Sequence, residues 1–515
     1  MAKNRSSTLK NIAIVSGATV VSRILGYLRD ILMITFLGIS EISDAFLLAL
    51  CLPNVFRKLL GEGAVSSTIV PVLSSHNAKY GKNSMLQLFS SILLRLFLCL
   101  AGILLLLYGA IFFANAMVHG AKWRMVLSFT AMMLPHMAFV CLAVMITAVL
   151  QVVGKFFVAS IGQILVNISM IASLLLGHFL LKYGGIKLAH CLIIGLLVGG
   201  ALQLAVPAFA VISMGWPWKF DAKVPHLKAR MGEIWKLFVP GVFGAVVEQA
   251  DIIIFRMIAF SSASAVSFLY VANRLIELPI GVFGFSIASV FFPNMAKFAS
   301  SSADDSRMGD IFRACFAAVL WILVPSAIGL FILNGEIVSV FFEYGNFRGV
   351  DVLSVCPIIS VYCINMLFSG ISPVFVRGFH ALGDTKTPAA IGVVTLGTNA
   401  LLSLALVKSF GAIGVASAIT CAAAVQTLCL AAVFSGKMNG APTFLRAKDC
   451  GIIFGGGVTV AIVALGIKFF IPLWCHLGKR VSDILTIVLA VGMSACAHLL
   501  ISRKFIGRTF SPQQK

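Results

Sequence analysis

Long stretches of almost uninterrupted apolar residues follow one another along the chain, separated by short clusters of charged residues, Gly and Pro. A helix needs about 20 apolar residues to span a membrane. Barrel strands would instead alternate between apolar and polar positions over about 10 residues, whereas the run 96–113 is almost continuously apolar. The pattern therefore predicts an all-α polytopic membrane protein with about 14 transmembrane helices. We expect them near 11–36, 44–72, 86–116, 125–153, 158–181, 189–215, 233–260, 267–297, 311–334, 353–380, 388–407, 412–436, 450–471 and 482–502.

The composition supports this class. Of the 515 residues, 60% are apolar and 11% are charged, whereas a soluble domain carries about 25% charged residues. The twelve cysteines are scattered without C-x-x-C pairs, which favours small core residues over a metal site. The basic N-terminus precedes an apolar stretch that continues past Arg23 without a cleavage pattern, so we interpret it as a retained first helix.

The distribution of basic residues predicts the orientation. The segments on the side of the N-terminus hold most of the Lys and Arg, and the outer loops hold fewer. By the positive-inside rule both termini are expected in the cytoplasm. We expect the membrane to be the inner membrane of a bacterium. The net charge of +21 then reflects topology and contact with anionic membrane lipids. Nucleic acid is not an expected partner, because no soluble basic face is visible.

A weak internal repeat predicts two lobes of six helices in parallel orientation. Phe46 lies 25 residues before Pro71, and Phe268 lies 25 residues before Pro293. Six spans return the chain to the same side, so the substrate path is expected between the lobes. The predicted parts are an N-terminal lobe 1–216, a cytoplasmic linker 217–232, a C-terminal lobe 233–436, two extra helices in 450–502, and a basic tail 503–515.

Charged residues inside the predicted spans are the main candidates for function, because such groups are costly in hydrocarbon. The excess is cationic. Guanidinium binds phosphate oxygens in a fork, so an arginine cluster in a cavity favours a phosphate-bearing substrate. A structural ion pair between Arg29 and Asp30 is an open alternative, as is snorkelling of Lys58 and Arg95. The cations are Arg23, Arg29, Arg57, Lys58, Arg95, Arg256 and Arg274, and the acids are Asp30, Glu62, Glu248, Asp251 and Glu277.

Motifs of enzymes are missing from the sequence. It contains no Walker A loop, metal-spaced His pair, nucleophile elbow or Gly-rich dinucleotide loop. We therefore expect a transporter rather than an enzyme, with no bound cofactor. Its energy would come from an ion gradient, the membrane potential or the gradient of the substrate.

Four segments closely resemble the MurJ (MviN) family, which belongs to the multidrug/oligosaccharidyl-lipid/polysaccharide exporter superfamily. They are Ser22–Asp30, Asp44–Pro71, Ala272–Pro279 and Gly383–Pro388, and the match runs in order through the first twelve spans. The resemblance implies a flippase that moves lipid II, an undecaprenyl-pyrophosphate-linked disaccharide pentapeptide, to the outer leaflet by alternating access. It also suggests a place in a cell-wall synthesis complex.

The resemblance also implies roles for individual residues. Spans 13 and 14 would form a groove for the lipid tail. Some members coordinate a cation, so Na⁺ or a proton is the candidate coupling ion. Ser403 stands where that cation site has an acid, which argues against cation coupling in this chain. Separately, Asn273 stands where many relatives have an acid. The implied substrate-binding residues are Arg23, Arg29, Arg57 and Arg274; the supporting or gating residues are Asp30, Asp44, Glu62, Ser267 and Glu277; the candidate cation ligands are Glu248, Asp251, Asn399 and Thr420.

Three other functions remain open from the sequence. A flippase for another lipid-linked oligosaccharide would share the pyrophosphate chemistry. A multidrug or cation exporter of related architecture would need acidic and aromatic groups where this chain has arginines. A scaffold without transport activity has no need for arginines near the middle of the membrane.

Overall fold

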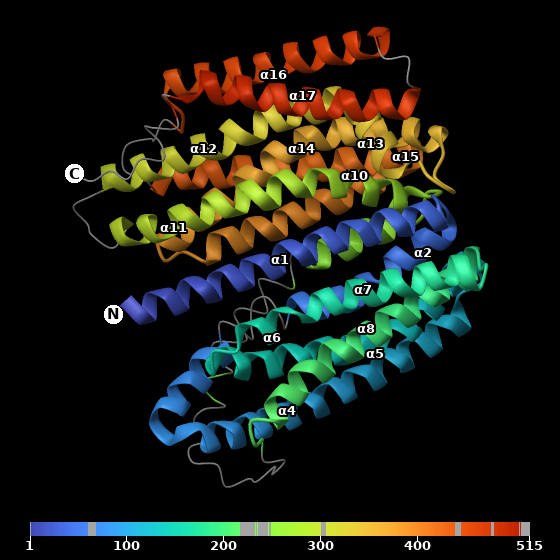
Figure 1. The fold of residues 1–515 in the computed structure, drawn as a ribbon, viewed down its shortest axis with the longest axis vertical. Helices are drawn as coiled ribbons and strands as arrows, with labels where there is room; N and C mark the ends of the chain where they lie inside the picture. Colours follow the sequence, from blue (N-terminus) through green and yellow to red (C-terminus); the bar gives the residue numbers. More distant parts are fainter. Residues whose placement is uncertain are drawn as a thin grey trace. The chain divides into compact units, whose positions relative to one another are not determined.

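The computed structural model describes residues 2–59, 68–216, 249–299, 305–437, 444–474 and 478–503, together with residues 232, 234, 246 and 505. Every regular element in this part of the chain is helical (Figure 1). Ten of the described helices are long and apolar enough to cross a membrane. The all-α polytopic class predicted from the sequence is therefore confirmed. The chain forms two compact units, residues 1–253 and 254–515.

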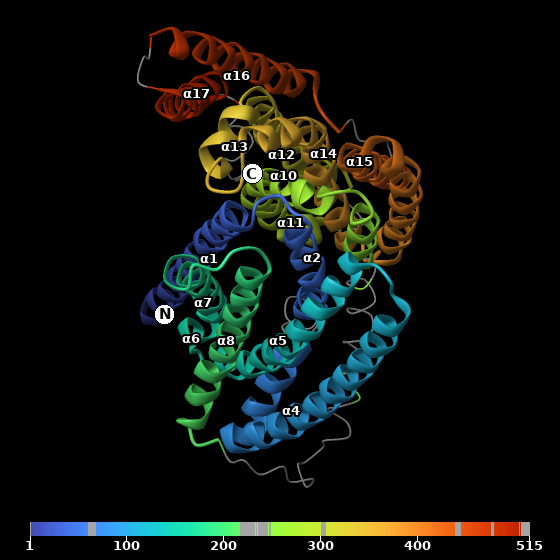
Figure 2. The same cartoon turned by 90° about the vertical axis from the view of Figure 1, so that its right-hand side faces the viewer.

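The first unit contains the predicted N-terminal lobe. Its helix α5 lies at the centre, because α2, α3, α4 and α8 all pack against it, while α1 packs against α7 and α7 against α8 (Figure 2). The elements are α1 (Ala2–Leu37), α2 (Glu41–Ala49), α3 (Cys51–Arg57), α4 (Val70–Met117), α5 (Ala121–Val152), α6 (Phe156–Ser160), α7 (Gly162–Leu175), the π-helical turn η2 (Leu176–Leu180) and α8 (Gly185–Ile212).

The second unit begins within a helical stretch at 249–259. Helix α14 takes the central place, packing against α10, α11, α12, α13 and α15, and the pair of helices α16 and α17 packs on α12 and α13. The elements are α10 (Ala265–Pro279), the π-helical turn η3 (Ile280–Gly284), α11 (Phe285–Ala299), α12 (Asp305–Ile332), α13 (Asn334–Phe342), α14 (Gly349–Ala381), α15 (Lys386–Lys437), α16 (Ala447–Trp474) and α17 (Lys479–Ile501).

Within the described residues the predicted spans agree with these helices, with three differences in detail; most of positions 233–248 in the predicted span 233–260 lie outside the described residues. Two pairs of predicted spans meet without a loop, because Gly81 in α4 and Gly411 in α15 take left-handed φ angles of 79° and 55° and turn the chain sharply. The second predicted span is broken at Leu50. Helix α13 was missed, because nine residues are too few to give a membrane-length apolar run. The predicted linker 217–232 lies outside the described residues except for its last position.

The repeat predicted from Phe46 and Phe268 has a counterpart in the backbone. Residues 58–59 are π-helical, and η3 begins at Ile280, at the same offset along the second copy. Turns of this kind interrupt the regular ladder of hydrogen bonds and occur often at functional sites. In both units the interruption follows the segment that carries the candidate arginines.

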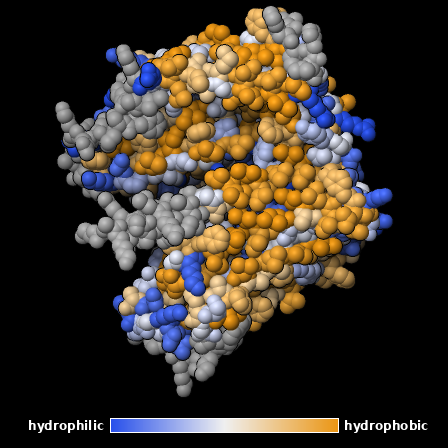
Figure 3. Space-filling model, in the orientation of Figure 1, coloured by the Kyte–Doolittle hydropathy of each residue, from blue (hydrophilic) through white to orange (hydrophobic). Residues whose placement is uncertain are grey.

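Most of the large exposed side chains are apolar, as expected for a surface in contact with lipid. Leu105 and Phe112 on α4 are both 74% exposed. On the face shown in Figure 3, apolar side chains cover the middle of the helices and hydrophilic side chains gather toward the helix ends. The hydrophobic effect therefore contributes little between these helices, and close packing must hold them together.

Glycines on α8 provide that close packing. A Cβ atom at Gly199 would lie 2.7 Å from the Cα of Val166 on α7, and one at Gly200 would lie 2.4 Å from Nδ1 of His136 on α5. Small residues at such positions let helix backbones approach one another in a membrane. Helix α8 therefore joins α7 and α5 through a surface that has no room for larger side chains.

The first prediction concerns this surface. Gly199→Ala should lower the free energy of unfolding by about 1–3 kcal/mol, the usual cost of overpacking, because the blocking atom belongs to the backbone of Val166 and cannot rotate away. Gly102→Ala on α4 is the matched control, since nothing lies within 4 Å of its added Cβ. Thermal unfolding of the detergent-solubilised protein measures both. Equal melting temperatures for the two variants would contradict this account.

Helices α16 and α17 are fixed to the rest of the second unit at both ends. At one end, the indole of Trp321 on α12 donates a hydrogen bond to Ser502 (2.7 Å) and stacks on His498, which donates to the Trp321 carbonyl (3.0 Å). Toward the other end, Lys468 on α16 pairs with Glu336 on α13 (3.0 Å). The two C-terminal helices are thus a docked part of this unit.

The loop between α14 and α15 is held by one carboxylate. Asp384 accepts hydrogen bonds from the backbone amides of Lys386 and Thr387 (both 3.0 Å) and from the Thr387 hydroxyl (2.6 Å), so it caps the start of α15. It also pairs with Lys437 at the end of the same element. The bonds from Lys437 and Thr387 hold the pKa of Asp384 well below its ordinary value.

The second prediction follows from this lowered pKa. Ionised Asp384 contributes fully to stability above pH 3.9 or so, which is about the pKa of this group in the unfolded chain. The contribution is lost as the pH falls toward the lower pKa that the group has in the folded protein. Asp384→Ala should cost about 1 kcal/mol at pH 7, the usual value of a helix cap. The difference from the unmodified protein should shrink below about pH 4. Lys437→Met, which keeps the cap, should cost less; a pH-independent difference would contradict the assignment.

Candidate functional site

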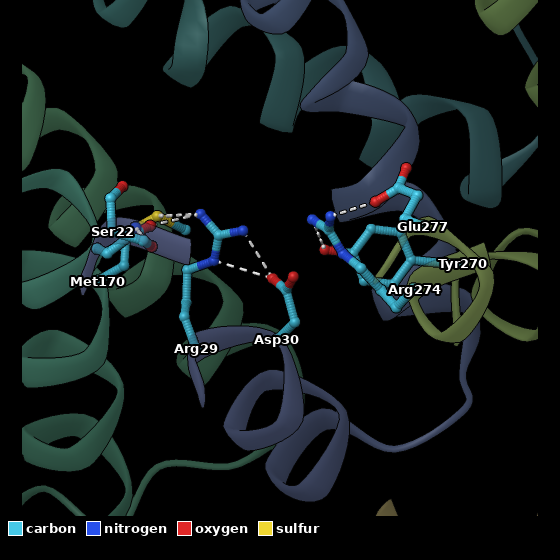
Figure 4. Close-up of polar contacts among 8 residues, drawn as sticks. Ser22, Arg29, Asp30, Met170, Tyr270, Arg274 and Glu277 are labelled. Carbon is cyan, nitrogen blue, oxygen red and sulfur yellow. Dashed lines mark hydrogen bonds and ion pairs between the residues drawn. The ribbon is translucent and has the colours of Figure 1, made fainter. Parts of the chain in front are cut away.

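In the first unit, Arg29 on α1 makes contacts with residues on two helices. Its Nε and Nη2 atoms donate to Oδ1 of Asp30 at 2.9 and 2.7 Å, and its Nη1 donates to Oδ1 of Asn167 on α7 at 3.1 Å. Nη1 also points toward the sulfur of Met170 (Figure 4). The Asn167 amide is oriented in turn, because its Nδ2 donates to the Ser22 carbonyl (3.0 Å).

The ion pair between Arg29 and Asp30 was one of the two interpretations of this segment, and the structure contains it. The side chain of Asp30 is 3% exposed and that of Arg29 is 13% exposed. A carboxylate buried this deeply would be costly without its cation. The pair therefore holds the guanidinium plane in one orientation, which is what a forked contact to a phosphate requires.

Three other candidates of the first unit lie at other described positions. Arg23 is exposed on α1, and Arg57 is half-buried at the end of α3. Asp44 on α2 is fully buried, with Lys122 at the start of α5 4.0 Å away. Glu62 lies outside the described residues. The sequence did not predict that Lys122 lies close to Asp44, because a lysine directly after a loop does not indicate which acid it approaches.

In the second unit, Arg274 on α10 is held in a comparable way. Its Nη1 donates to Oε2 of Glu277 (2.8 Å), and its Nη2 donates to the Tyr270 hydroxyl (3.0 Å). The guanidinium carbon lies 4.9 Å from the centre of the Tyr270 ring, so a cation–π contact adds to the hydrogen bonds (Figure 4). Tyr270, Arg274 and Glu277 lie on one helix at i, i+4 and i+7 spacing, and Ser267 is buried one turn before Tyr270. Tyr270 was not predicted as a partner of Arg274, although its position four residues before the arginine could have revealed it.

The structure explains the Asn at position 273. Its Nδ2 donates a hydrogen bond to Oε1 of Glu277 at 2.6 Å, so the two oxygens of Glu277 accept from Asn273 and Arg274 respectively. An ionised acid at position 273 would instead face the Glu277 carboxylate at that short distance, with like charges repelling. The amide therefore replaces a repulsion by a hydrogen bond and leaves this face of α10 more positive.

The candidate cation ligands belong to two parts of the chain, α15 and the stretch before α10. Asn399, Ser403 and Thr420 are buried in α15; Ser403 donates to Oδ1 of Asn399 (3.2 Å), and Thr420 donates to the Ala416 carbonyl (2.8 Å). These side chains carry no charge, so they favour a cation only weakly. Asp251 is half-buried in the stretch 249–259, and Glu248 lies outside the described residues. Coupling to Na⁺ or a proton therefore stays a prediction.

The chain is similar to known proteins over most of its length. A family model described as "Lipid II flippase MurJ" matches residues 33–500. A relative from Rhizobium meliloti (strain 1021), named as a probable lipid II flippase MurJ, is 28% identical over 435 residues, which cover 82% of this chain and 80% of the relative.

The fold is also shared with solved structures. One titled as the lipid II flippase MurJ in an inward closed conformation has a TM-score of 0.73 at 24% sequence identity, covering 96% of this chain and 99% of that one. An inward-facing multidrug resistance MATE transporter of the MOP superfamily has a TM-score of 0.64 at 13% identity, covering 80% and 95%. The family model extends over most of the sequence, and the chain belongs to the MurJ family of lipid II flippases.

Proposed function

We propose that this protein moves lipid II from the cytoplasmic to the outer leaflet by alternating access, and that Arg29 and Arg274 bind its pyrophosphate and sugar head. The observation that carries the proposal is the way both guanidinium groups are held. Each lies within an apolar helix and is oriented by an acid on the same helix, Asp30 and Glu277 respectively. An oriented guanidinium loses less entropy when it forms a forked contact with a phosphate.

Binding would keep the ion pair in place. The pyrophosphate oxygens would accept hydrogen bonds from the two Nη atoms of Arg29, while Asp30 keeps its bond from Nε and Asn167 keeps its bond from Nη1. Arg23 and Arg57 would add positive potential, since a pyrophosphate carries more than one negative charge. A multidrug or cation exporter is the weaker alternative, because these candidates are cationic where such a substrate needs acids.

The lipid tail would lie against the C-terminal helix pair. Apolar side chains on α16 and α17 are strongly exposed, among them Phe454 (75%), Phe469 (68%) and Leu500 (65%). The docking of this pair through Trp321 and Lys468 would keep the apolar face in place during transport. Membership of a cell-wall synthesis complex stays a prediction.

The third prediction separates phosphate binding by Arg29 from its structural role. Arg29→Ala should weaken lipid II binding by about one to two orders of magnitude, the value of one charge-assisted hydrogen bond, and Arg29→Lys should recover part of it, because the charge remains without the planar fork. Arg95→Ala is the control, since this intramembrane arginine on α4 donates to the Ser91 carbonyl of its own helix. Binding is measured with purified protein and lipid II.

A double variant resolves the remaining ambiguity in this experiment. Arg29→Ala alone leaves the Asp30 carboxylate buried without its cation, and the protein would lose stability for that reason. Arg29→Ala combined with Asp30→Asn removes both charges. We expect the double variant to regain thermal stability but not lipid II binding. Full recovery of binding in the double variant would show that Arg29 acts only through the structure.

The fourth prediction tests the orientation, with both termini in the cytoplasm of a bacterial cell. Single cysteines at Asn83 and Asn346, both exposed positions, are introduced into a variant without other cysteines. In intact cells a membrane-impermeant thiol reagent should label Asn346→Cys and leave Asn83→Cys unlabelled until the cells are opened. The reverse pattern would overturn the orientation.

A further inference from the structure

Two arginines share one carboxylate beside the start of α16, within the second unit. Arg446 directly precedes α16, and its Nη2 atom donates to Oδ1 of Asp310 on α12 at 3.0 Å. Nη2 of Arg313, also on α12, lies 3.4 Å from an oxygen of the same carboxylate. Among the described residues, Asp310 is the one acid that forms an ion pair with either guanidinium group. The three side chains together therefore carry one net positive charge.

One carboxylate leaves several donors of this group unused. The Nε atom of Arg313 is buried and has no hydrogen-bond partner among the described residues. The side chain of Arg446 is 51% exposed, and in the described part of the chain it donates only to Asp310. A guanidinium group has five N–H donors in a planar fork. The remaining N–H groups of Arg446 can therefore bind an anion while Nη2 keeps its bond to Asp310.

Apolar packing fixes the backbone at this place. The centre of the Phe444 ring lies 5.7 Å from that of Phe316 on α12, and Leu445 packs on a buried cluster that contains Trp321 and Phe505. The two residues before Arg446 are thus held against neighbouring elements of the second unit. Because the chain is already ordered here, a ligand of Arg446 would not have to order it on binding.

The exposed face of α16 continues from Arg446 as an apolar stripe. Cys450, Phe454 and Val458 follow the arginine at four-residue intervals, so they lie on one side of the helix. Cys450 is exposed, Phe454 is 75% exposed and Val458 is 41% exposed. An acyl chain of any lipid can lie along such a stripe. The cation at its end then decides which head group is preferred.

We propose that this group binds the phosphate of an anionic phospholipid, with Arg446 as the direct partner and Arg313 as a source of added positive potential. One net positive charge matches the single negative charge of a phosphodiester head, whereas a pyrophosphate carries more charge. Basic clusters between spanning helices at a membrane surface bind lipid heads of this kind. A lipid held here ties the start of α16 to α12. Its binding does not depend on the transport of lipid II.

The test compares an anionic with a zwitterionic lipid at this position. In the full-length protein, the exposed Cys450 is kept as the single cysteine and carries a fluorophore. The protein is reconstituted in mixtures of phosphatidylglycerol and phosphatidylcholine, in which one lipid at a time has brominated chains that quench the fluorophore on contact. Quenching should show about five-fold tighter binding of phosphatidylglycerol, the value of one arginine at a charged membrane surface. A fluorophore on the exposed Cys99 of α4 is the control and should show no preference.

Variants with effects of opposite sign link the preference to this group. Arg446→Gln should remove most of the preference for phosphatidylglycerol. Lys408→Gln, which removes the same charge from an exposed position near the turn at Gly411, should leave the preference unchanged. Asp310→Asn should raise it about five-fold, because the shared acid no longer neutralises an arginine. A damaged fold cannot produce tighter binding, so this gain does not depend on the stability of the variants.

Competitors identify the source of the phosphate. Excess glycerol phosphate, or lipid II in an amount equal to the protein, should leave the quenching by brominated phosphatidylglycerol unchanged. Loss of quenching with glycerol phosphate would mean a site for a soluble anion, and loss with lipid II would mean a part of the substrate path. Either result would overturn the phospholipid site, as would equal quenching by both lipids or a preference that survives in Arg446→Gln. The proposed function is decided separately, by lipid II binding.

Discussion

Compensation of charge inside an apolar layer is the constraint on which the rest of this structure depends. A cation or an acid at depth in a membrane is costly unless a partner or water stabilises it. The described helices meet this cost with close ion pairs, at 2.7 Å for Arg29 with Asp30, and 2.8 Å for Arg274 with Glu277. These pairs allow charge to persist among apolar helices.

Helix packing serves the same constraint. Apolar side chains gain little from facing one another in lipid, so the contacts that fix helices relative to one another are backbone contacts and polar ties. Gly199 brings α8 against α7, and the Trp321–Ser502 bond fixes α17 to α12. The precise positions of the charged groups then follow from these few specific contacts.

The sequence predicted the helical class, the approximate spans and the family, because long apolar runs and local motifs are properties of contiguous residues. Family membership confirms the predicted transporter class. The sequence also indicated the pairing of Arg29 with Asp30, since these residues are neighbours. It could not give Asn167 as a partner of Arg29, or Lys122 as a neighbour of Asp44, because those contacts join segments far apart in the chain. The kinks at Gly81 and Gly411 likewise depend on local backbone angles that a glycine permits but does not require.

The placement of the acids keeps each of these charge pairs within a single helix. In both candidate groups the acid lies on the same helix as its arginine, one residue away in α1 and three residues away in α10. Such a pair moves with its helix, so the charge stays compensated if the helix is displaced. The pair between Lys468 and Glu336 joins different helices instead, and it would resist their separation. Pairs within a helix therefore suit groups that must move with a substrate, whereas pairs between helices suit parts that must stay docked.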